Sequence, residues 1–125
     1  MRLLALMVVA NFVAASATAV HACPDLSGMF ECPAQGNQAP MKLIITNSHY
    51  SNGFAIYKFR YIRSRESTWE RTASREGIKM RDGTRNSCTD NEFKINETRN
   101  FINAAGNYEE ATTGGLTKMI CTRQK

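Results

Sequence analysis

Few residues in this 125-residue chain combine the types and spacings that catalysis requires. His49 comes shortly before Asn52-Gly53, where we expect a solvated turn, and no Gly-x-Ser-x-Gly elbow surrounds any serine. Glu109 and Glu110 are adjacent, so in a strand they point to opposite faces and cannot act on one substrate. We therefore expect no catalytic residues and a protein that is not an enzyme.

The four cysteines offer a second kind of chemistry. Cys23, Cys32, Cys88 and Cys121 show neither a Cys-x-x-Cys redox spacing nor a zinc pattern with histidine, so we expect no metal and no cofactor. In a secreted chain they favour two structural disulfides, each stabilising the fold by about 2–4 kcal/mol. Four cysteines allow three pairings, and the sequence leaves the pairing open.

Residues 1–22 have the features of a secretory signal peptide. Met1-Arg2 is positively charged, and an apolar stretch followed by small residues comes next. Cleavage fits after Ala19 or after Ala22, and we favour the second, which leaves 23–125 as a single domain. The mature chain would then begin at a cysteine, and lipid anchoring through Cys23 is the alternative to a freely secreted or periplasmic protein.

The stretch from Met41 to Ile62 carries the clearest β-hairpin signal in the sequence. Two runs rich in apolar, aromatic and β-branched residues flank Ser51-Asn52-Gly53, and Asn-Gly between such runs is a strong hairpin signal. Further short runs follow, with a second hairpin signal at Gly114-Gly115 and a polar loop expected over 85–91. These features predict a mostly β fold, a small antiparallel up-and-down barrel or sandwich of about eight strands.

Aromatic side chains gather on the second strand of the predicted hairpin and on the strand after it. Tyr57, Phe59 and Tyr61 share one face because strand side chains alternate, and Trp69, the only tryptophan, comes next along the chain. In a closed barrel these four side chains would contact a small apolar ligand.

The N-terminal part of the mature chain resembles a known group of barrels. Leu26-Ser27-Gly28-Met29-Phe30, then a loop, then the Met41–Ile62 hairpin, looks like the opening of calycin-type barrels such as lipocalins and avidins. Their first strand carries Gly-x-Trp, and the match here is Gly28-x-Phe30. The resemblance implies an up-and-down barrel whose mouth holds a small apolar ligand, and it assigns no binding residue.

Positive charge is unevenly distributed along the chain, whose formal net charge is +5. Between Lys58 and Arg85 there are nine basic and four acidic residues. Five of the bases fall on neighbouring predicted strands: Lys58, Arg60, Arg71, Lys79 and Arg81. Together they would form a cationic patch for nucleic acid, an anionic lipid surface or an acidic polysaccharide.

The sequence therefore predicts a non-catalytic binding domain that is secreted or periplasmic. In the first interpretation, a barrel holds a small apolar ligand against its aromatic side chains. In the alternatives, the cationic patch docks on an anionic surface or acidic partner, or the chain is an inhibitor that acts through loops such as Pro33–Pro40.

Overall fold

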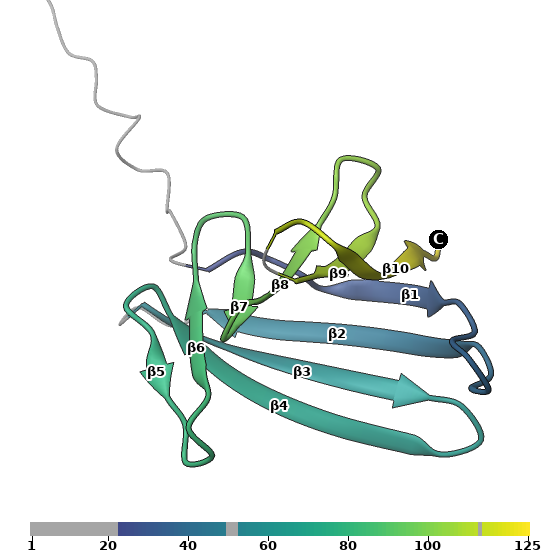
Figure 1. Cartoon of the computed structure of the whole chain (residues 1–125), viewed down its shortest axis with the longest axis horizontal. Coiled ribbons are helices and arrows are strands. Elements are labelled where there is room, and N and C mark those ends of the chain that lie inside the picture. Colours follow the sequence, from purple (N-terminus) through teal and green to yellow (C-terminus); the bar gives the residue numbers. More distant parts are fainter. Residues whose placement is uncertain (1–22, 50–52, 113) are drawn as a thin grey trace, which may run out of the picture.

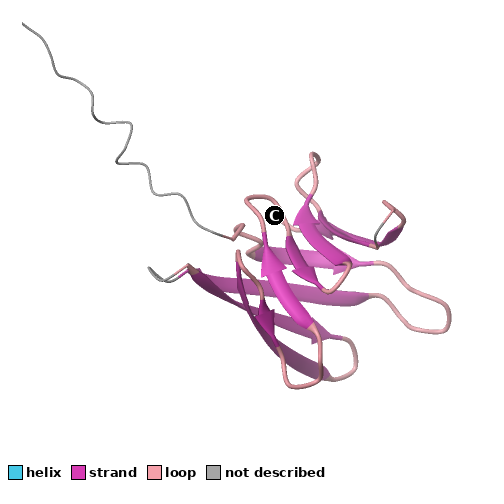
Figure 2. Ribbon diagram, turned by 60° about the vertical axis from the view of Figure 1, so that its left-hand side comes forward, coloured by secondary structure: helices cyan, strands magenta, loops and turns pink. Residues whose placement is uncertain are grey.

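The computed structural model describes residues 23–49, 53–112 and 114–125. The predicted signal peptide with its two cleavage sites lies outside these residues, as does the Ser51-Asn52 part of the predicted turn. The described chain is built of strands and loops (Figure 1), and the same holds in the second view (Figure 2). Among the described residues, no helix is long and apolar enough to cross a membrane.

Ten strands are present in the described chain. They are β1 (Gly28–Cys32), β2 (Met41–His49), β3 (Phe54–Ile62), β4 (Glu66–Ser74), β5 (Ile78–Lys79), β6 (Arg85–Cys88), β7 (Phe93–Ile95), β8 (Thr98–Ile102), β9 (Tyr108–Ala111) and β10 (Thr117–Arg123).

The strands form a meander that closes into a barrel. Neighbours in sequence are neighbours in the sheet, β1 also pairs with β10, and β4 meets β6 at Ser74 and Ser87, which leaves β5 outside a closed ring of nine strands. The β4–β6 contact is parallel, because an up-and-down ring with an odd number of strands needs one parallel neighbour. The predicted mostly β fold is confirmed, and of barrel and sandwich the structure is the barrel.

The structure has ten strands instead of the eight expected, and β6 and β8 account for the difference. Residues 85–91 were expected as a loop, but Arg85–Cys88 form β6, with Asn86 and Cys88 buried on its inner face. In β8, Asn100 takes the buried position. An inward-facing asparagine hides the alternation of apolar and polar residues by which a strand is recognised.

The predicted central hairpin is confirmed by the pairing of β2 with β3. Their register runs from Lys42 opposite Ile62 to His49 opposite Ala55. Gly53, directly before β3, has a φ of 86°, a conformation that glycine adopts without steric cost.

The N-terminal segment Cys23–Ser27 covers one end of the barrel, which we call the closed end. Leu26 is fully buried there, and its backbone N–H donates to Asn47 Oδ1 at 2.8 Å. The Tyr57 hydroxyl, near the closed end of the interior, donates to the carbonyl oxygen of Pro24 at 2.6 Å. The segment thus supplies both apolar cover and hydrogen-bond partners to the interior.

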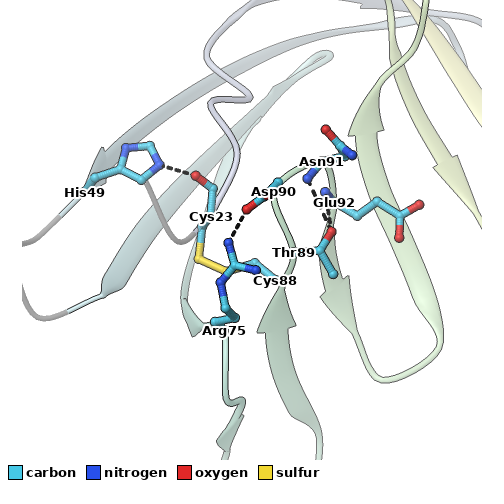
Figure 3. Close-up of polar contacts among 8 residues, drawn as sticks. All are labelled: Cys23, His49, Arg75, Cys88, Thr89, Asp90, Asn91 and Glu92. Carbon is cyan, nitrogen blue, oxygen red and sulfur yellow. Dashed lines mark hydrogen bonds and ion pairs between the residues drawn. A yellow bond between two sulfur atoms is a disulfide. The ribbon is translucent and has the colours of Figure 1, made fainter. Parts of the chain in front are cut away.

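Two contacts at the closed end hold this segment and the neighbouring loop, as Figure 3 shows. His49 Nε2 lies 2.9 Å from the carbonyl oxygen of Cys23 and is the donor, because a carbonyl oxygen only accepts. Arg75 forms an ion pair with Asp90 in the loop that follows β6.

Both disulfides form within the chain, as expected, and the structure supplies the pairing that the sequence left open. Cys23 bonds to Cys88 on β6, and Cys32 on β1 bonds to Cys121 on β10. Two such bonds are consistent with an extracellular or periplasmic location. The Cys23 sulfur is occupied by its disulfide, so in this structure it is not available for a lipid thioether.

Near the C-terminus, the Arg123 side chain contacts Phe30 on β1 and Gly106 in the loop before β9. Its guanidinium carbon lies 4.8 Å from the centre of the Phe30 ring, and its Nε donates to the carbonyl oxygen of Gly106 at 2.8 Å. A side chain at Gly28 would collide with this guanidinium, so the close approach of Arg123 requires glycine there.

Candidate ligand-binding site

The end of the barrel opposite the N-terminal segment, which we call the open end, contains a cavity of about 400 Å³. Strands β3, β4, β7, β8, β9 and β10 all contribute to its wall. The lining residues are Phe59, Tyr61, Trp69, Arg71, Ile95, Thr98, Asn100, Glu110 and Lys118. Three of the four predicted ligand-binding aromatics therefore lie together in one cavity.

Tyr57, the fourth predicted aromatic, is placed elsewhere. Its side chain is fully buried, and its ring stacks on Phe93 with 4.6 Å between the ring centres. Burial raises the pKa of Tyr57 well above its ordinary value, so its hydroxyl stays protonated and donates to Pro24. Tyr57 thus belongs to the core below the cavity and not to the cavity wall.

Trp69 lies on the inner face of β4 and yet is 52% exposed. It sits opposite Phe59 in the β3–β4 register, on the same face as the buried Ala73. The exposure arises because β4 pairs with β3 along its whole length, whereas among the described strands its other edge meets only β6, at Ser74. Among the described strands, none pairs with this edge of β4 beside Trp69.

The seam between β4 and β6 is narrow. Besides the single bridge, Asn86 Nδ2 donates to the carbonyl oxygen of Thr72 at 3.1 Å across it. The first half of β4, Glu66 to Glu70, is exposed on both faces. The indole of Trp69 therefore lies at an uncovered edge of the barrel wall, where it lines the cavity.

Arg71 lies on the same face as Trp69 and lines the same cavity. Its guanidinium carbon is 5.1 Å from the centre of the Trp69 ring, a cation–π geometry, and one of its N–H groups donates to the Glu70 carbonyl oxygen at 3.2 Å. A guanidinium has five N–H donors, so most of them stay available for other partners.

Tyr61 connects the apolar and the polar parts of the cavity. Its ring stacks on Phe59 with 6.3 Å between centres. Burial raises its pKa to about 12, with a smaller contribution from the negative charge of Glu110, while Arg71 lowers it. The hydroxyl is therefore neutral near pH 7 and can donate a hydrogen bond into the cavity.

A second hollow, of about 470 Å³, adjoins the first and shares four of its lining residues. The shared residues are Tyr61, Trp69, Glu110 and Lys118. Lys118 Nζ lies 3.6 Å from Glu110 Oε1. Arg63 borders this hollow, so the two hollows together are lined by three basic side chains and one acidic side chain.

The loop 33–40 forms part of the rim of this second hollow. Arg63 donates to the carbonyl oxygen of Ala39 at 3.0 Å and to Gln38 Oε1 at 3.1 Å. Gln35 Nε2 donates to the carbonyl oxygen of Lys118 at 3.2 Å. The loop considered from sequence as an interaction loop is thus anchored beside the cavity.

The five residues of the predicted cationic patch are distributed over different surfaces. Lys58 and Arg60 lie on the outer face of β3, whereas Arg71 lies on the inner face of β4. Arg60 pairs with Glu66 at 2.9 Å, which lowers the pKa of that carboxyl. Lys79 and Arg81 belong to β5 and the turn after it, outside the ring.

The carboxylates considered for catalysis point apart, as the alternation predicts. Glu109 accepts hydrogen bonds from Asn103 Nδ2 and the Thr117 hydroxyl, whereas Glu110 lines the cavity. Within the described parts of the chain, no group of three or more His, Cys, Asp or Glu side chains is placed to hold a metal ion.

A hollow of about 510 Å³ beside the closed end has a different character. Three acidic side chains line it: Glu92 pairs with Arg99 at 2.7 Å, Asp90 pairs with Arg75, and Asp25 accepts hydrogen bonds from Ser27. This lining is mainly acidic and has no aromatic side chain as exposed as Trp69, so the open end is the better candidate for a ligand site.

Several cavity residues were not predicted from the sequence, among them Glu110, Lys118 and Asn100. The alternation Tyr108-x-Glu110 marks Glu110 as inward-facing once Tyr108 is recognised as core. Lys118 reaches the cavity at an irregularity in the β9–β10 pairing, between Thr117 and Met119, for which the sequence carries no signal.

No known protein family matches this chain, and neither a curated protein nor a solved structure matches it. The closed barrel is compatible with the calycin-type resemblance. The fold and the cavity define a small, disulfide-bonded β-barrel with an aromatic cavity at its open end.

Proposed function

We propose that this protein is a non-catalytic binding domain that holds a small ligand with an apolar body in the cavity at the open end. The observation that carries the proposal is Trp69, a half-exposed indole on the inner face of the barrel wall that lines the cavity together with Phe59 and Tyr61. Covering such an aromatic plate in a concave site is favourable, because it removes a large apolar surface from water.

The size of the cavity supports a small-molecule ligand. A volume of about 400 Å³ falls in the range of pockets that bind drug-sized molecules, and the lining mixes aromatic side chains with a few polar groups. Asn100 at the cavity wall is fixed by two hydrogen bonds, from Tyr108 Oη at 2.7 Å and to the Phe93 carbonyl at 3.0 Å. Asn100 therefore needs little reorganisation when a ligand binds.

We also propose that the protein acts outside the cytoplasm, as a secreted or periplasmic protein. The N-terminal sequence and the two disulfides support this location. Intact mass and N-terminal sequencing of the exported protein test it: a chain that begins at Cys23 is expected, and an uncleaved chain would contradict it.

The cationic patch is the weaker candidate for a binding surface. Arg60 is engaged by Glu66, and Arg71 faces the cavity instead of the outer surface that Lys58 and Arg60 share. The basic side chain best placed to meet a ligand is therefore part of the open end.

Fluorescence titration tests the proposed function. Trp69 is the only tryptophan, so its emission reports on this cavity alone. Two lipophilic probes with the same skeleton are suitable, N-phenyl-1-naphthylamine and its 8-sulfonate, and saturable quenching of Trp69 by at least one of them is expected.

A pair of variants localises the binding, read from the fluorescence of the probe itself. Trp69→Ala is expected to weaken the affinity by about tenfold or more, as for a central aromatic anchor. Met29→Ala, on the outer face of β1 and 46% exposed, is the control and should leave the affinity unchanged. Absence of saturable binding of both probes, or equal weakening in both variants, would overturn the proposal.

A further inference from the structure

We infer that the ligand of the open end carries an anionic head group, such as a carboxylate, sulfonate or phosphate, beside its apolar body. This inference rests on the proposed function and specifies the chemical class of the ligand. The apolar body would lie against Phe59 and Trp69, and the head group would meet Arg71.

The first support is the position of Arg71. The ring of Trp69 holds its guanidinium at 5.1 Å, within the cavity lining, and one of its N–H groups donates to the Glu70 carbonyl oxygen. Arginine presents a planar fork of donors that matches the two oxygens of a carboxylate, and its charge persists at every physiological pH. The indole and the guanidinium together offer an apolar face and an anion site side by side.

The second support is the charge balance of the lining. Arg63, Arg71 and Lys118 face one acid, Glu110, over the two adjoining hollows. Lys118 lies close enough to Glu110 to compensate its charge, which leaves the lining itself with a net positive charge from Arg71 and Arg63. Outside the lining, the carboxylate of Asp82 also lies within electrostatic reach of Arg71. A cationic ligand would be repelled by this lining, whereas an anionic one is attracted.

The third support is the Tyr61 hydroxyl. Its pKa responds to the charges of both Glu110 and Arg71, so the phenol, the carboxylate and the guanidinium lie within electrostatic reach of one another. Tyr61 is neutral near pH 7 and supplies a further donor for an anion. Tyr61, Arg71 and Glu110 thus form one charged and polar group in the lining, to which Phe59 and Ile95 add apolar contacts.

The matched probes test this inference on the unmodified protein. N-phenyl-1-naphthylamine is neutral, and its 8-sulfonate adds a single anionic group to the same skeleton. We expect the sulfonate to bind about tenfold tighter, with an affinity that falls as salt is raised, whereas the affinity of the neutral probe is insensitive to salt. Energy transfer from Trp69 to the bound probe shows that binding occurs in this cavity.

Three variants test whether Arg71 holds the head group. Arg71→Gln is expected to remove most of the preference for the sulfonate, and Glu110→Gln is expected to increase it, while neither changes the affinity for the neutral probe by more than about twofold. Arg60→Gln removes a positive charge from the outer face of the neighbouring strand and should have no effect.

The possible outcomes separate the anionic head group from ligand binding itself. Equal affinity of the two probes, tighter binding of the neutral one, or a preference that survives in Arg71→Gln would overturn the anionic head group and leave ligand binding standing. If neither probe binds, the proposed function fails together with the inference. Because the two probes are compared on the unmodified chain, the result stands even if a variant does not fold.

Discussion

The two ends of the barrel differ in how far they bury inward-facing side chains of the same two strands, β3 and β4. On β3, Tyr57 at the closed end is fully buried, whereas Tyr61 at the open end is partly exposed. On β4, Ala73 is buried, and Trp69, four residues earlier on the same face, is half exposed. The strands are continuous, so the difference lies in what covers them.

At the closed end, the N-terminal segment of the chain covers the barrel interior. Cys23–Ser27 crosses that end, and a disulfide, the buried Leu26 and the hydrogen bond from Tyr57 fix it there. At the open end, no described strand pairs with the outer edge of β4 beside Trp69. The closed end therefore stabilises the fold, whereas the open end has aromatic surface left to cover with a ligand.

Truncating one aromatic at each end should separate stability from binding. Tyr57→Ala is expected to lower the free energy of unfolding by about 3–5 kcal/mol, because it leaves a cavity and an unpaired carbonyl in the core. Trp69→Ala should change it by less than about 1 kcal/mol, because half of that ring already contacts water. Urea denaturation measures both, and equal losses would break the distinction between the two ends.

Removing the disulfide of the closed end should leave the open end working. The double variant Cys23→Ser with Cys88→Ser is expected to lose about 2–4 kcal/mol of stability while its probe affinity stays within about twofold. Chemical denaturation and probe titration give the two values. A large loss of affinity in protein that remains folded would show that the two ends are coupled.

Alkaline titration compares the burial of individual tyrosines at the two ends of the barrel. The pKa of Tyr61 rises to about 12, and burial raises those of Tyr57 and Tyr108 as well. An unfolded tyrosine ionises near pH 10, so the contribution of Tyr61 to stability is complete below that pH. It is lost as pH rises toward 12, by about 1.4 kcal/mol per pH unit.

Tyrosinate absorbance, followed together with unfolding, checks this prediction. Tyr61→Phe should remove the pH-dependent contribution of Tyr61 to stability. Tyr57 and Tyr108 in the folded core should still resist ionisation. Ionisation of Tyr61 near pH 10 in folded protein would contradict the burial of its side chain at the open end.

Local signals in the sequence were enough to predict the central hairpin and the two faces of its second strand. Asn52-Gly53 marks the turn between β2 and β3, and the alternation of Tyr57 and Phe59 with polar neighbours marks the inner face. These features depend on residues close together in the chain, where turn chemistry and strand periodicity act directly.

The exposure of Trp69 could not be predicted in the same way. It depends on where β6 meets β4, at Ser74 and Ser87, and the sequence carries no signal for so short a contact. Strand parity does place Arg71 on the face of Trp69, and the register of β3 with β4 separates it from Arg60. Parity divides the predicted cationic patch between the two faces only when it is combined with this register.

Native mass spectrometry of mature protein, purified gently from the compartment to which it is exported, tests the central claim most directly. We predict a bound acidic molecule of roughly drug-like size that denaturation releases and that a parallel Trp69→Ala preparation lacks. A bare mass for the unmodified chain, or the same bound molecule on Trp69→Ala, would contradict the assignment of ligand binding to the open end.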